Sequence, residues 1–585
     1  MFPKKFKRSG MFYKRCAQLE AQFEREWAEQ HNSAGPSGQS AIVQSAEDAF
    51  LNRDLEVEYI KEEYVEDILD DEYISDEASI VNDDSDERKW CEEEYLEEEI
   101  SEISSESLKL RDSLRTWFIL NKVSRNASNN LLAILRNVSS LSAFSSLPQD
   151  VRTLLKAPVN VSDQIATVPG GGQMWYQGVE CCLQHYFRNV VVAENIFELN
   201  LSTDGVPVYN RSPTQMWPIL MQLHNIPDVP VMVVRIFCGA NKPSDAETFL
   251  RPLVTELNNL QDNKIKINGK EISLSVRVFI ADSPARAFIK QVCYYNGVHG
   301  CMKCKGLGTS LKNPKKVIFE DTTADLRTDV EFRNEPCNAK GHRRGETPLT
   351  DLKNFDMIKD VTTSDILHLV HVGVVHKLLL GWTEGDLKPF KKWSKDEIAE
   401  ISEELVSIQL PSEIHRRFRS LESLHYWKAS ELGSFLNYGG IVVLQERIGR
   451  VAYEHFKLLY CALTMLSSTA FKEHWHYAGI LLRKFVEDYK IVYNRMYLVS
   501  NVHLLIHVYD DVCKFGPLNT ISTYPFEDKL QHIKHSYVRS GYRSLQQAIG
   551  KITLLRDIET ADRRDNIVYP ILKIKKDEVI LQFFS

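Results

Sequence analysis

One stretch of the sequence joins a strand end, a helix start and a cysteine pair: Phe279-Ile-Ala-Asp282-Ser-Pro-Ala-Arg-Ala-Phe-Ile-Lys-Gln-Val-Cys-Tyr-Tyr-Asn-Gly-Val-His-Gly-Cys301-Met-Lys-Cys304. Residues Ile272–Ile280 are rich in β-branched and apolar side chains and predict a strand that ends just before Asp282. Ser283 is expected to cap a helix that begins at Pro284, where the missing N–H costs nothing. The carboxylate of Asp282 is therefore expected at the carboxyl end of a strand, where open α/β sheets place their reactive groups.

The Cys-x-x-Cys pair at Cys301 and Cys304 is half of a tetrahedral zinc site, and the second half is expected elsewhere in the chain. His503 and His507 are four residues apart, so a helix would present both imidazoles on one face. Together the four side chains form a closed Cys₂His₂ set. Such a site would fasten both ends of the intervening residues to the part of the chain that contains Asp282.

Upstream of Asp282, alternating apolar residues predict a first strand that ends at Asp204, before a glycine turn. Two more strands and a helix opened by a capping box at Ser244–Glu247 follow, in the segments 216–223, 229–237 and 244–260. The order β-β-β-α-β is that of the ribonuclease H-like fold, an α/β core with a mixed sheet. Its first and fourth strands are neighbours, so Asp204 and Asp282 are expected side by side. The alternative is that the two aspartates only form turns.

Two adjacent carboxylates are what a two-metal phosphoryl-transfer site needs, because Mg²⁺ prefers oxygen ligands and keeps positions open for phosphate and water. A third acid is expected from a later helix. Glu527 follows His507 by 20 residues, much as Cys301 follows Asp282 by 19. Asp528 competes for this role, but adjacent helical residues face about 100° apart, so only one of the two acids should point inward.

Charge is distributed unevenly along the 585 residues. Between Glu47 and Glu106 there are 26 Asp or Glu and four Lys or Arg, a local charge of −22, which leaves 67 basic and 54 acidic residues, or +13, for the rest. A basic body with an acidic segment is typical of a chain that binds a polyanion such as nucleic acid. Eleven scattered cysteines and the lack of a long apolar run predict a reduced, intracellular protein without a membrane partner.

These patterns divide the chain into six segments. Residues 1–45 are a basic segment and linker, in which Lys4–Arg8 is either a solvated terminus or a nuclear localisation signal. Residues 46–109 are acidic and expected to be mostly disordered, as a solvating tail or an interaction motif. Order is expected from about Leu110. The remaining segments are a helical domain with a packing hairpin or a DNA-reading helix-turn-helix (110–190), the first part of the core (191–304), an all-helical insertion (305–500) and the zinc helix with the last part of the core (501–585).

Further side chains are candidates for a site. Cys337 and His342 lie in a polar, basic loop, where phosphate contact or no role is favoured over metal binding. Asp365, His368 and His371 are spaced by three on an apolar helix, where a buried polar ladder is favoured over a metal site.

The remaining candidates for a site are Arg286 and the charged pair Lys428 and Glu431. Arg286, one turn after Asp282, has the geometry to contact a scissile phosphate. Lys428 and Glu431 are interpreted as an ordinary surface pair or as support for a site.

Taken together, eight short pieces resemble CACTA (En/Spm-like) cut-and-paste transposases. The pieces are Ser202-Thr-Asp-Gly-Val-Pro207, Met216-Trp-Pro-Ile-Leu220, Ala281-Asp-Ser-Pro-Ala-Arg286, Gly300-Cys-x-x-Cys304, Asp365-Ile-Leu-His368, Val502-His-Leu-Leu-Ile-His507, Phe515-Gly-Pro-Leu518 and Tyr524-Pro-Phe-Glu527. The resemblance runs from about Leu110 to beyond Glu527. It extends to the recombinase that assembles antigen-receptor genes, in which a zinc site also frames a helical insertion. The N-terminal residues depart from the pattern, because they contain no zinc finger.

The resemblance implies a DDE transposase in which Asp204, Asp282 and Glu527 bind two Mg²⁺ (or Mn²⁺) ions, and Cys301, Cys304, His503 and His507 bind a structural Zn²⁺. The implied chemistry is hydrolysis of double-stranded DNA at transposon ends, followed by attack of a 3′-OH on target DNA. It also implies a nuclear location and at least a homodimer, because two DNA ends are handled together. The alternatives are a host-adopted, catalytically silent DNA- or chromatin-binding protein and a ribonuclease H-like nuclease without strand transfer.

Overall fold

The structure, a computed structural model, describes residues 105–559 apart from 122, 139–141, 157–160, 169–170, 209–212, 386, 388 and 535–542. The basic segment 1–45 and the acidic residues 46–104 lie outside the described part of the chain, and so do the expectations made for them. Order was expected from about Leu110, but the first helix, α3, already begins at Ser105.

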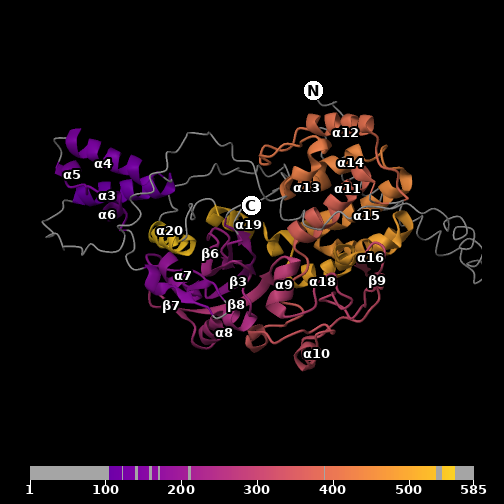
Figure 1. Ribbon diagram of the computed structural model, residues 1–585, viewed down its shortest axis with the longest axis horizontal. Helices are drawn as coiled ribbons and strands as arrows, with labels where there is room; N and C mark the ends of the chain where they lie inside the picture. The colour runs from indigo at the N-terminus through magenta and orange to yellow at the C-terminus, as the bar shows by residue number, and fades with distance from the viewer. Residues whose placement is uncertain are drawn as a thin grey trace, which may run out of the picture. The chain divides into compact units, whose positions relative to one another are not determined.

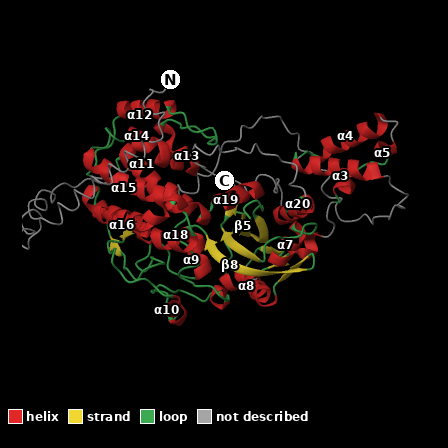
Figure 2. Cartoon of the chain, turned by 180° about the vertical axis from the view of Figure 1, so that it is seen from behind, coloured by secondary structure: helices red, strands yellow, loops and turns green. Residues whose placement is uncertain are grey.

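A mixed sheet of eight strands forms the centre of the α/β part (Figures 1 and 2). Its strands lie in the order β1-β2-β6-β5-β3-β8-β7, and β4 pairs with β5 beside this path. The strands are β1 (Ala166–Thr167), β2 (Gln173–Tyr176), β3 (Ile196–Thr203), β4 (Val206–Pro207), β5 (Gln215–Leu223), β6 (Met232–Gly239), β7 (Ile265–Ile267) and β8 (Lys270–Ile280).

The sheet confirms the expected neighbourhood of the first and fourth predicted strands, β3 and β8. These two strands pair in parallel, with Ser202 opposite Ile280, whereas every other pairing in the sheet is antiparallel. Parallel neighbours end at the same edge of a sheet. The residues that follow them, Asp204 and Asp282, therefore leave the sheet side by side.

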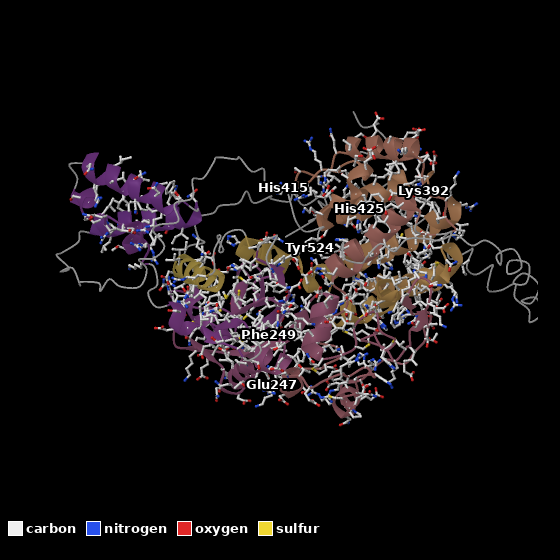
Figure 3. All side chains as sticks on the ribbon, viewed as in Figure 1. Glu247, Phe249, Lys392, His415, His425 and Tyr524 are labelled. Atoms are coloured by element: carbon white, nitrogen blue, oxygen red, sulfur yellow. The ribbon has the colours of Figure 1, made fainter. Side chains whose placement is uncertain are left out.

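Helices α7 (Val179–Tyr186), α8 (Ala246–Asn263) and α9 (Ser283–Lys290) pack on this sheet in one apolar core. Phe249 from α8, labelled in Figure 3, contacts Phe288 from α9 with the ring centroids 5.8 Å apart. The expected capping box at Ser244–Glu247 is wrong by one residue. Asp245 caps α8 instead, and its carboxylate accepts hydrogen bonds from two backbone N–H groups of the first turn, because a carboxylate attracts the positive end of the helix dipole.

The expectation of an N-terminal helical domain over residues 110–190 is corrected in part. Four helices do form a small apolar cluster of their own, but β1 and β2 belong to the sheet and α7 packs on it. Part of this expected helical domain is thus a strand followed by a short helix, β2 and α7. The four helices are α3 (Ser105–Leu120), α4 (Arg125–Val138), α5 (Ser142–Ser145) and α6 (Val151–Leu155), and a 3₁₀ turn, η5 (Val161–Gln164), precedes β1.

The insertion expected over residues 305–500 is not all helical. It opens with the hairpin β9 (Thr309–Leu311) and β10 (Lys316–Ile318), the short helix α10 (Asp329–Asn334) and the 3₁₀ turn η6 (Pro348–Asp351). Apolar side chains between Phe332 and Val361 belong to the core of the sheet. Val361 also forms a parallel bridge to Phe279, so this segment extends the sheet beside the end of β8.

Dense helical structure begins only at Ile366. The first helix is a π-helix, η7 (Ile366–Val375), which continues into α11 (His376–Glu384). The span Ile366–Glu384 is apolar and long enough to cross a membrane by composition, but 72% of its most apolar window is buried inside the protein, so it is an interior helix. The following elements are α12 (Lys395–Ser407), η8 (Leu421–Tyr426), α13 (Ala429–Ser434), η9 (Phe435–Gly439), α14 (Gly440–Val443), α15 (Arg450–Leu466), η10 (Thr469–His474), α16 (Trp475–Val492) and η11 (Arg495–Tyr497).

After the insertion the chain returns to the sheet. Arg277 of β8 holds the returning segment, because its guanidinium donates to the carbonyl oxygens of Phe515 and Thr520 and to the Asn200 side chain of β3. The last elements are α17 (Ser500–Leu504), η12 (Leu505–His507), α18 (Val508–Phe515), η13 (Leu518–Ile521), α19 (Tyr524–His532) and α20 (Ser544–Ile558).

Candidate functional site

The four side chains of the expected Cys₂His₂ set meet at one point. The Cys304 Sγ lies 3.3 Å from the His503 Nε2, and the Cys301 Sγ lies 3.5 Å from the His507 Nε2. The two sulfur atoms are 3.5 Å apart. All four residues are buried, and each offers a ligand atom within 4.8 Å of the other three. This arrangement can hold a metal ion.

The two thiols of this set differ in their tendency to ionise. Burial opposes ionisation of Cys301 most, but hydrogen bonds with Cys304, His503 and His507 outweigh it and hold the pKa of Cys301 well below its ordinary range. The hydrogen bond with Cys301, followed by burial, raises the pKa of Cys304. A thiolate is therefore favoured here, which is the form of cysteine that binds metal.

A buried ion pair links the cysteine loop to the histidine helix. The Lys303 Nζ donates to the Asp511 carboxylate at 2.7 Å, and both side chains are at most 7% exposed. The other oxygen of Asp511 accepts hydrogen bonds from the hydroxyls of Thr362 (2.8 Å) and Ser364 (2.7 Å). One carboxylate thus connects the loop of Cys301 and Cys304, the helix after His507 and the segment that leads into Asp365.

Asp204 and Glu527 meet at the carboxyl ends of β3 and β8, and His368 joins them. One ligand atom from each of the three lies within 4.8 Å of the others, and the His368 Nε2 is 3.7 Å from the Glu527 Oε1. Glu527 points inward with 12% of its side chain exposed, whereas its neighbour Asp528 is exposed. The expectation that only one of these two acids faces the site is confirmed.

Asp282 lies at the rim of this group. Its charge raises the pKa of both Asp204 and Glu527, but it is not part of the set that converges within 4.8 Å. Its Oδ1 accepts a hydrogen bond from the Ala285 N–H at 2.7 Å, so Asp282 itself caps α9 and the expectation that Ser283 does so is wrong. The reason is that α9 begins one residue earlier, at Ser283, with Pro284 still in its first turn. The cap occupies one carboxylate oxygen of Asp282.

Crowding of acids shifts their protonation. Burial and the charges of Asp282 and Glu527 raise the pKa of Asp204 well above its ordinary value. Burial and the charge of Asp282 raise the pKa of Glu527 to about 7, although His368 opposes this shift. A divalent cation would favour the charged form of these converging carboxylates, because a nearby positive charge lowers the pKa of an acid. The donor set therefore fits a metal ion.

Asp365 and His368 reach this site by a route that the sequence did not reveal. Asp365 is fully buried, and burial opposes its ionisation, but the hydrogen bond with His368 and those from Thr523 lower its pKa to about 2. The apolar spacing predicted a buried polar ladder, and this holds for His371, which is hydrogen-bonded to Tyr524. His368 instead faces Asp204 and Glu527. The Asp365-x-x-His368 pattern itself was the available signal.

The other candidate side chains are engaged elsewhere. The Arg286 guanidinium is buried and donates to Ala281 O at 2.6 Å and to the Ser283 hydroxyl at 2.8 Å, so it holds the loop around Asp282 and is turned away from solvent. Glu431 is not a surface group. It is fully buried and forms an ion pair with Arg419 at 2.8 Å, while the Lys428 N–H donates to its carboxylate.

Cys337 and His342 take no part in either group. Cys337 is exposed and hydrogen-bonds to Glu346, and the His342 Nδ1 faces the carbonyl oxygen of His299 at 2.8 Å. Neither residue belongs to a metal-holding set among the described residues.

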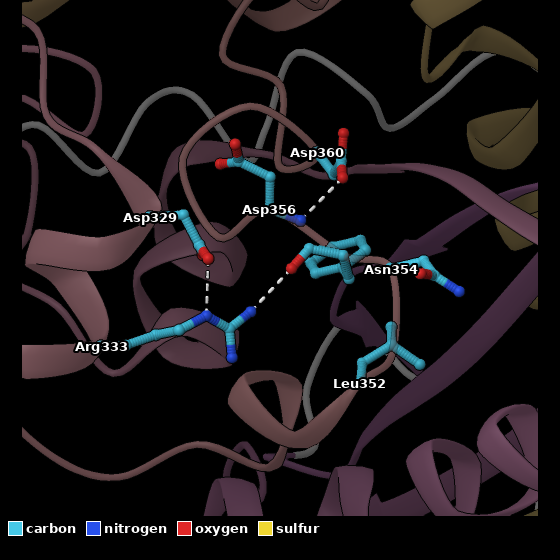
Figure 4. A pocket seen from close by; sticks show the side chains of 7 residues that line it. Asp329, Arg333, Leu352, Asn354, Asp356 and Asp360 are labelled. Atoms are coloured by element: carbon cyan, nitrogen blue, oxygen red, sulfur yellow. Dashed lines mark hydrogen bonds and ion pairs between the residues drawn. The ribbon is translucent and has the colours of Figure 1, made fainter.

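A surface pocket of about 470 Å³ contains three further acids, shown in Figure 4. Asp329 accepts from the Arg333 guanidinium, Asp356 from the N–H groups of residues 358 and 359, and Asp360 from the Lys514 ammonium group. None of these three carboxylates belongs to a converging set of ligand atoms among the described residues, so this pocket is not a second candidate for a metal site.

No protein-family model matches the chain, and no curated protein is significantly similar to it. Its function must therefore be inferred from the two groups of side chains and from the sheet that carries them.

Proposed function

We propose that the chain has a ribonuclease H-like core and is a DDE transposase-type polynucleotidyl transferase that cuts and joins DNA. The observation that carries this proposal is the meeting of Asp204, from the end of β3, with Glu527, from a helix beyond a long insertion, at the edge where β8 delivers Asp282. The resemblance to CACTA transposases assigns the same three residues as the catalytic acids.

The Cys₂His₂ set supports this proposal as a structural zinc site. Zinc bonds of about 2.3 Å to sulfur and about 2.05 Å to nitrogen in a tetrahedron place neighbouring ligand atoms roughly 3.5–3.8 Å apart. The observed separations of 3.3 and 3.5 Å are close to this value. Four protein ligands leave no open position, so the zinc has a structural role. It fastens the two chain segments that carry Asp282 and Glu527.

The acids have a different role. Asp204, Asp282 and Glu527 would hold two Mg²⁺ or Mn²⁺ ions, which when bound supply charge stabilisation and a more acidic water. The chain's own carboxylates fix the place at which a phosphodiester is held, and Asp365 and Thr523 fix the ring of His368 beside it. The positive charge of the body outside the acidic segment favours DNA as the substrate. A nuclear location and a dimer that holds two DNA ends belong to the same proposal.

Cleavage and strand transfer of labelled DNA test this proposal, with the flanks of the gene's own locus as candidate ends, in Mg²⁺ and in Mn²⁺. The matched variants are Glu527→Gln and Asp528→Asn, which remove the charges of adjacent acids, one facing the site and one exposed. We expect Glu527→Gln to lower the rate at least a thousandfold and Asp528→Asn to leave it nearly unchanged, because only Glu527 lies in the group that holds metal.

Other outcomes point to the alternatives. Cleavage without joining would favour a ribonuclease H-like nuclease. Binding of DNA without cleavage in either metal would favour a host-adopted, catalytically silent DNA- or chromatin-binding protein. Equal activity of the Glu527→Gln variant and the wild type would overturn the assignment of the acids.

A further inference from the structure

One histidine in the acid group has the environment of a metal ligand. The His368 Nδ1 lies 2.6 Å from the Asp365 Oδ2, and its Nε2 faces Glu527. Metal-binding histidines commonly donate one ring N–H to a carboxylate, which fixes the tautomer and leaves the other nitrogen for the metal. Asp365 is fully buried and cannot turn toward solvent. The other ring nitrogen of His368, Nε2, is thereby directed at the acids, and a metal ion bound there would take the place of its proton.

Asp365 is itself held in place by several donors. The Thr523 N–H and hydroxyl donate to its two oxygens at 2.9 and 2.6 Å, and the Leu367 and His368 N–H groups donate at 3.2 Å. Thr523 immediately precedes α19, the helix that carries Glu527. The same contacts therefore position the histidine and the glutamate relative to each other.

The backbone around His368 is unusual. Residues Ile366–Val375 form a π-helix, which is rare and frequently occurs at functional sites. Gly373 permits close packing here, because a Cβ at this position would come within 2.6 Å of the His368 carbonyl oxygen. Two histidines of this helix have different partners. His371 contacts the Tyr524 hydroxyl at 2.8 Å, and only His368 belongs to the group with Asp204 and Glu527.

We propose that the His368 Nε2 is a direct ligand of one metal ion held by Asp204 and Glu527, and that this nitrogen makes the site prefer Mn²⁺ to Mg²⁺. Imidazole is a good ligand for transition metals, whereas Mg²⁺ is bound almost entirely through oxygen. Mn²⁺ accepts both ligand types. The inference rests on the proposed function, because it involves the same acids. It identifies a ligand of the metal ion and makes no statement about the reaction.

Pulsed electron paramagnetic resonance of bound Mn²⁺ tests this inference without any measurement of activity. The sample is the full chain with zinc content verified, so that His503 and His507 are occupied. We expect nitrogen modulation from a coordinated imidazole in the wild type, its replacement by the ¹⁵N pattern in protein grown with ¹⁵N-histidine, and its loss in His368→Gln. The isotope measurement needs no substitution and holds even where a variant fails to fold.

The matched control is His371→Gln, which removes the neighbouring buried histidine of the same helix and should keep the nitrogen modulation. Competition between the metals gives a second readout: we expect His368→Gln to reduce the preference for Mn²⁺ over Mg²⁺ by about tenfold or more.

The outcomes separate this inference from the proposed function. Mn²⁺ that is lost in Asp204→Asn but shows no histidine nitrogen in the wild type would overturn the inference alone, and His368 would then be a protonated partner of Glu527. Nitrogen-coordinated Mn²⁺ without any DNA cleavage would overturn the proposed function alone. Failure of Mn²⁺ to bind at the acids would overturn both.

Discussion

The Cys/His group and the Asp/His/Glu group come from different stretches of the chain and differ in their electrostatics. In the first, none of the four residues is more than 3% exposed, and hydrogen bonds among the ligands favour a thiolate. In the second, His368 and Glu527 are 17% and 12% exposed, and burial and crowding disfavour the charged form of the acids. The contacts of the first group stabilise the fold, whereas the second group costs stability that a bound cation would recover. Substitutions in the two groups should therefore have opposite effects on stability.

The largest effect is expected from Cys301→Ser, which removes a ligand of the Cys/His group. Structural zinc binding in small domains is worth about 10 kcal/mol or more, which is comparable with the whole stability of a protein. We expect the variant to bind no zinc and to lose its cooperative thermal transition. Zinc analysis and calorimetry measure this. The control Cys337→Ser changes an exposed thiol outside both groups and should keep one zinc per chain; full stability of Cys301→Ser would contradict the closed site.

A smaller loss is expected from Lys303→Met, which breaks the buried ion pair between the cysteine loop and the histidine helix and leaves every metal ligand in place. The variant leaves the Asp511 carboxylate buried without its cation, which typically costs about 3–5 kcal/mol. Urea unfolding measures the loss, and zinc should remain bound. Lys305→Met is the matched control, because Lys305 lies two residues after Lys303 and forms an exposed ion pair with Glu331. If the two variants were equally stable, the buried pair would have no role in holding the cysteine loop to the histidine helix.

Asp204→Asn should change stability in the opposite direction. The folded-state pKa of Asp204 lies well above 3.8, the value for the unfolded chain. At a pH between 3.8 and the folded-state pKa, the folded chain therefore binds more protons than the unfolded chain. Stability is then lost as the pH rises through the folded-state pKa. Asn keeps the acceptor for the Gly205 N–H and has no charge. Without divalent ions at pH 8, we expect the variant to be more stable than the wild type and to unfold at a higher urea concentration, because it has no charge beside the other acids.

Measurement of Asp204→Asn at pH 4 provides the internal control, because the difference from the wild type should shrink there. A variant that is less stable than the wild type at pH 8 would show that the acids are not under electrostatic strain.

The smallest effect is expected from the divalent ion itself. An ion at ten times its Kd stabilises the folded state by about 1.4 kcal/mol, and we expect Mg²⁺ and Mn²⁺ to raise the Tm of the wild type accordingly. Asp204→Asn should not respond, since it has lost a ligand. An equal response of both proteins would place the ion elsewhere.

The sequence predicted the parts of the site that depend on local pattern. Asp204 and Asp282 each follow an apolar strand, and the cysteine and histidine pairs have the spacing of a metal site, so all four features could be read without a structure. Asp282 was expected after the strand, but its role as the helix cap depends on the exact first residue of α9, which periodicity does not fix.

The position of His368 depended on contacts that no local pattern contains. It reaches the acids because residues 360–362 pair with Phe279 at the end of β8 and because Thr523 holds Asp365. These partners lie far apart in the chain. The same limitation explains β2, whose short apolar run resembles a helix start until it is paired with β6.

The order of synthesis on the ribosome determines when each group of side chains is complete. Asp204, Asp282 and both cysteines are synthesised before the long insertion and His368 within it, but His503, His507 and Glu527 come only after it. During translation of the insertion, the nascent chain therefore has two half-built groups and neither is complete. A truncated or stalled product would keep the strands with Asp204 and Asp282 and lack the glutamate, so the proposed active site stays incomplete until Glu527 has been translated.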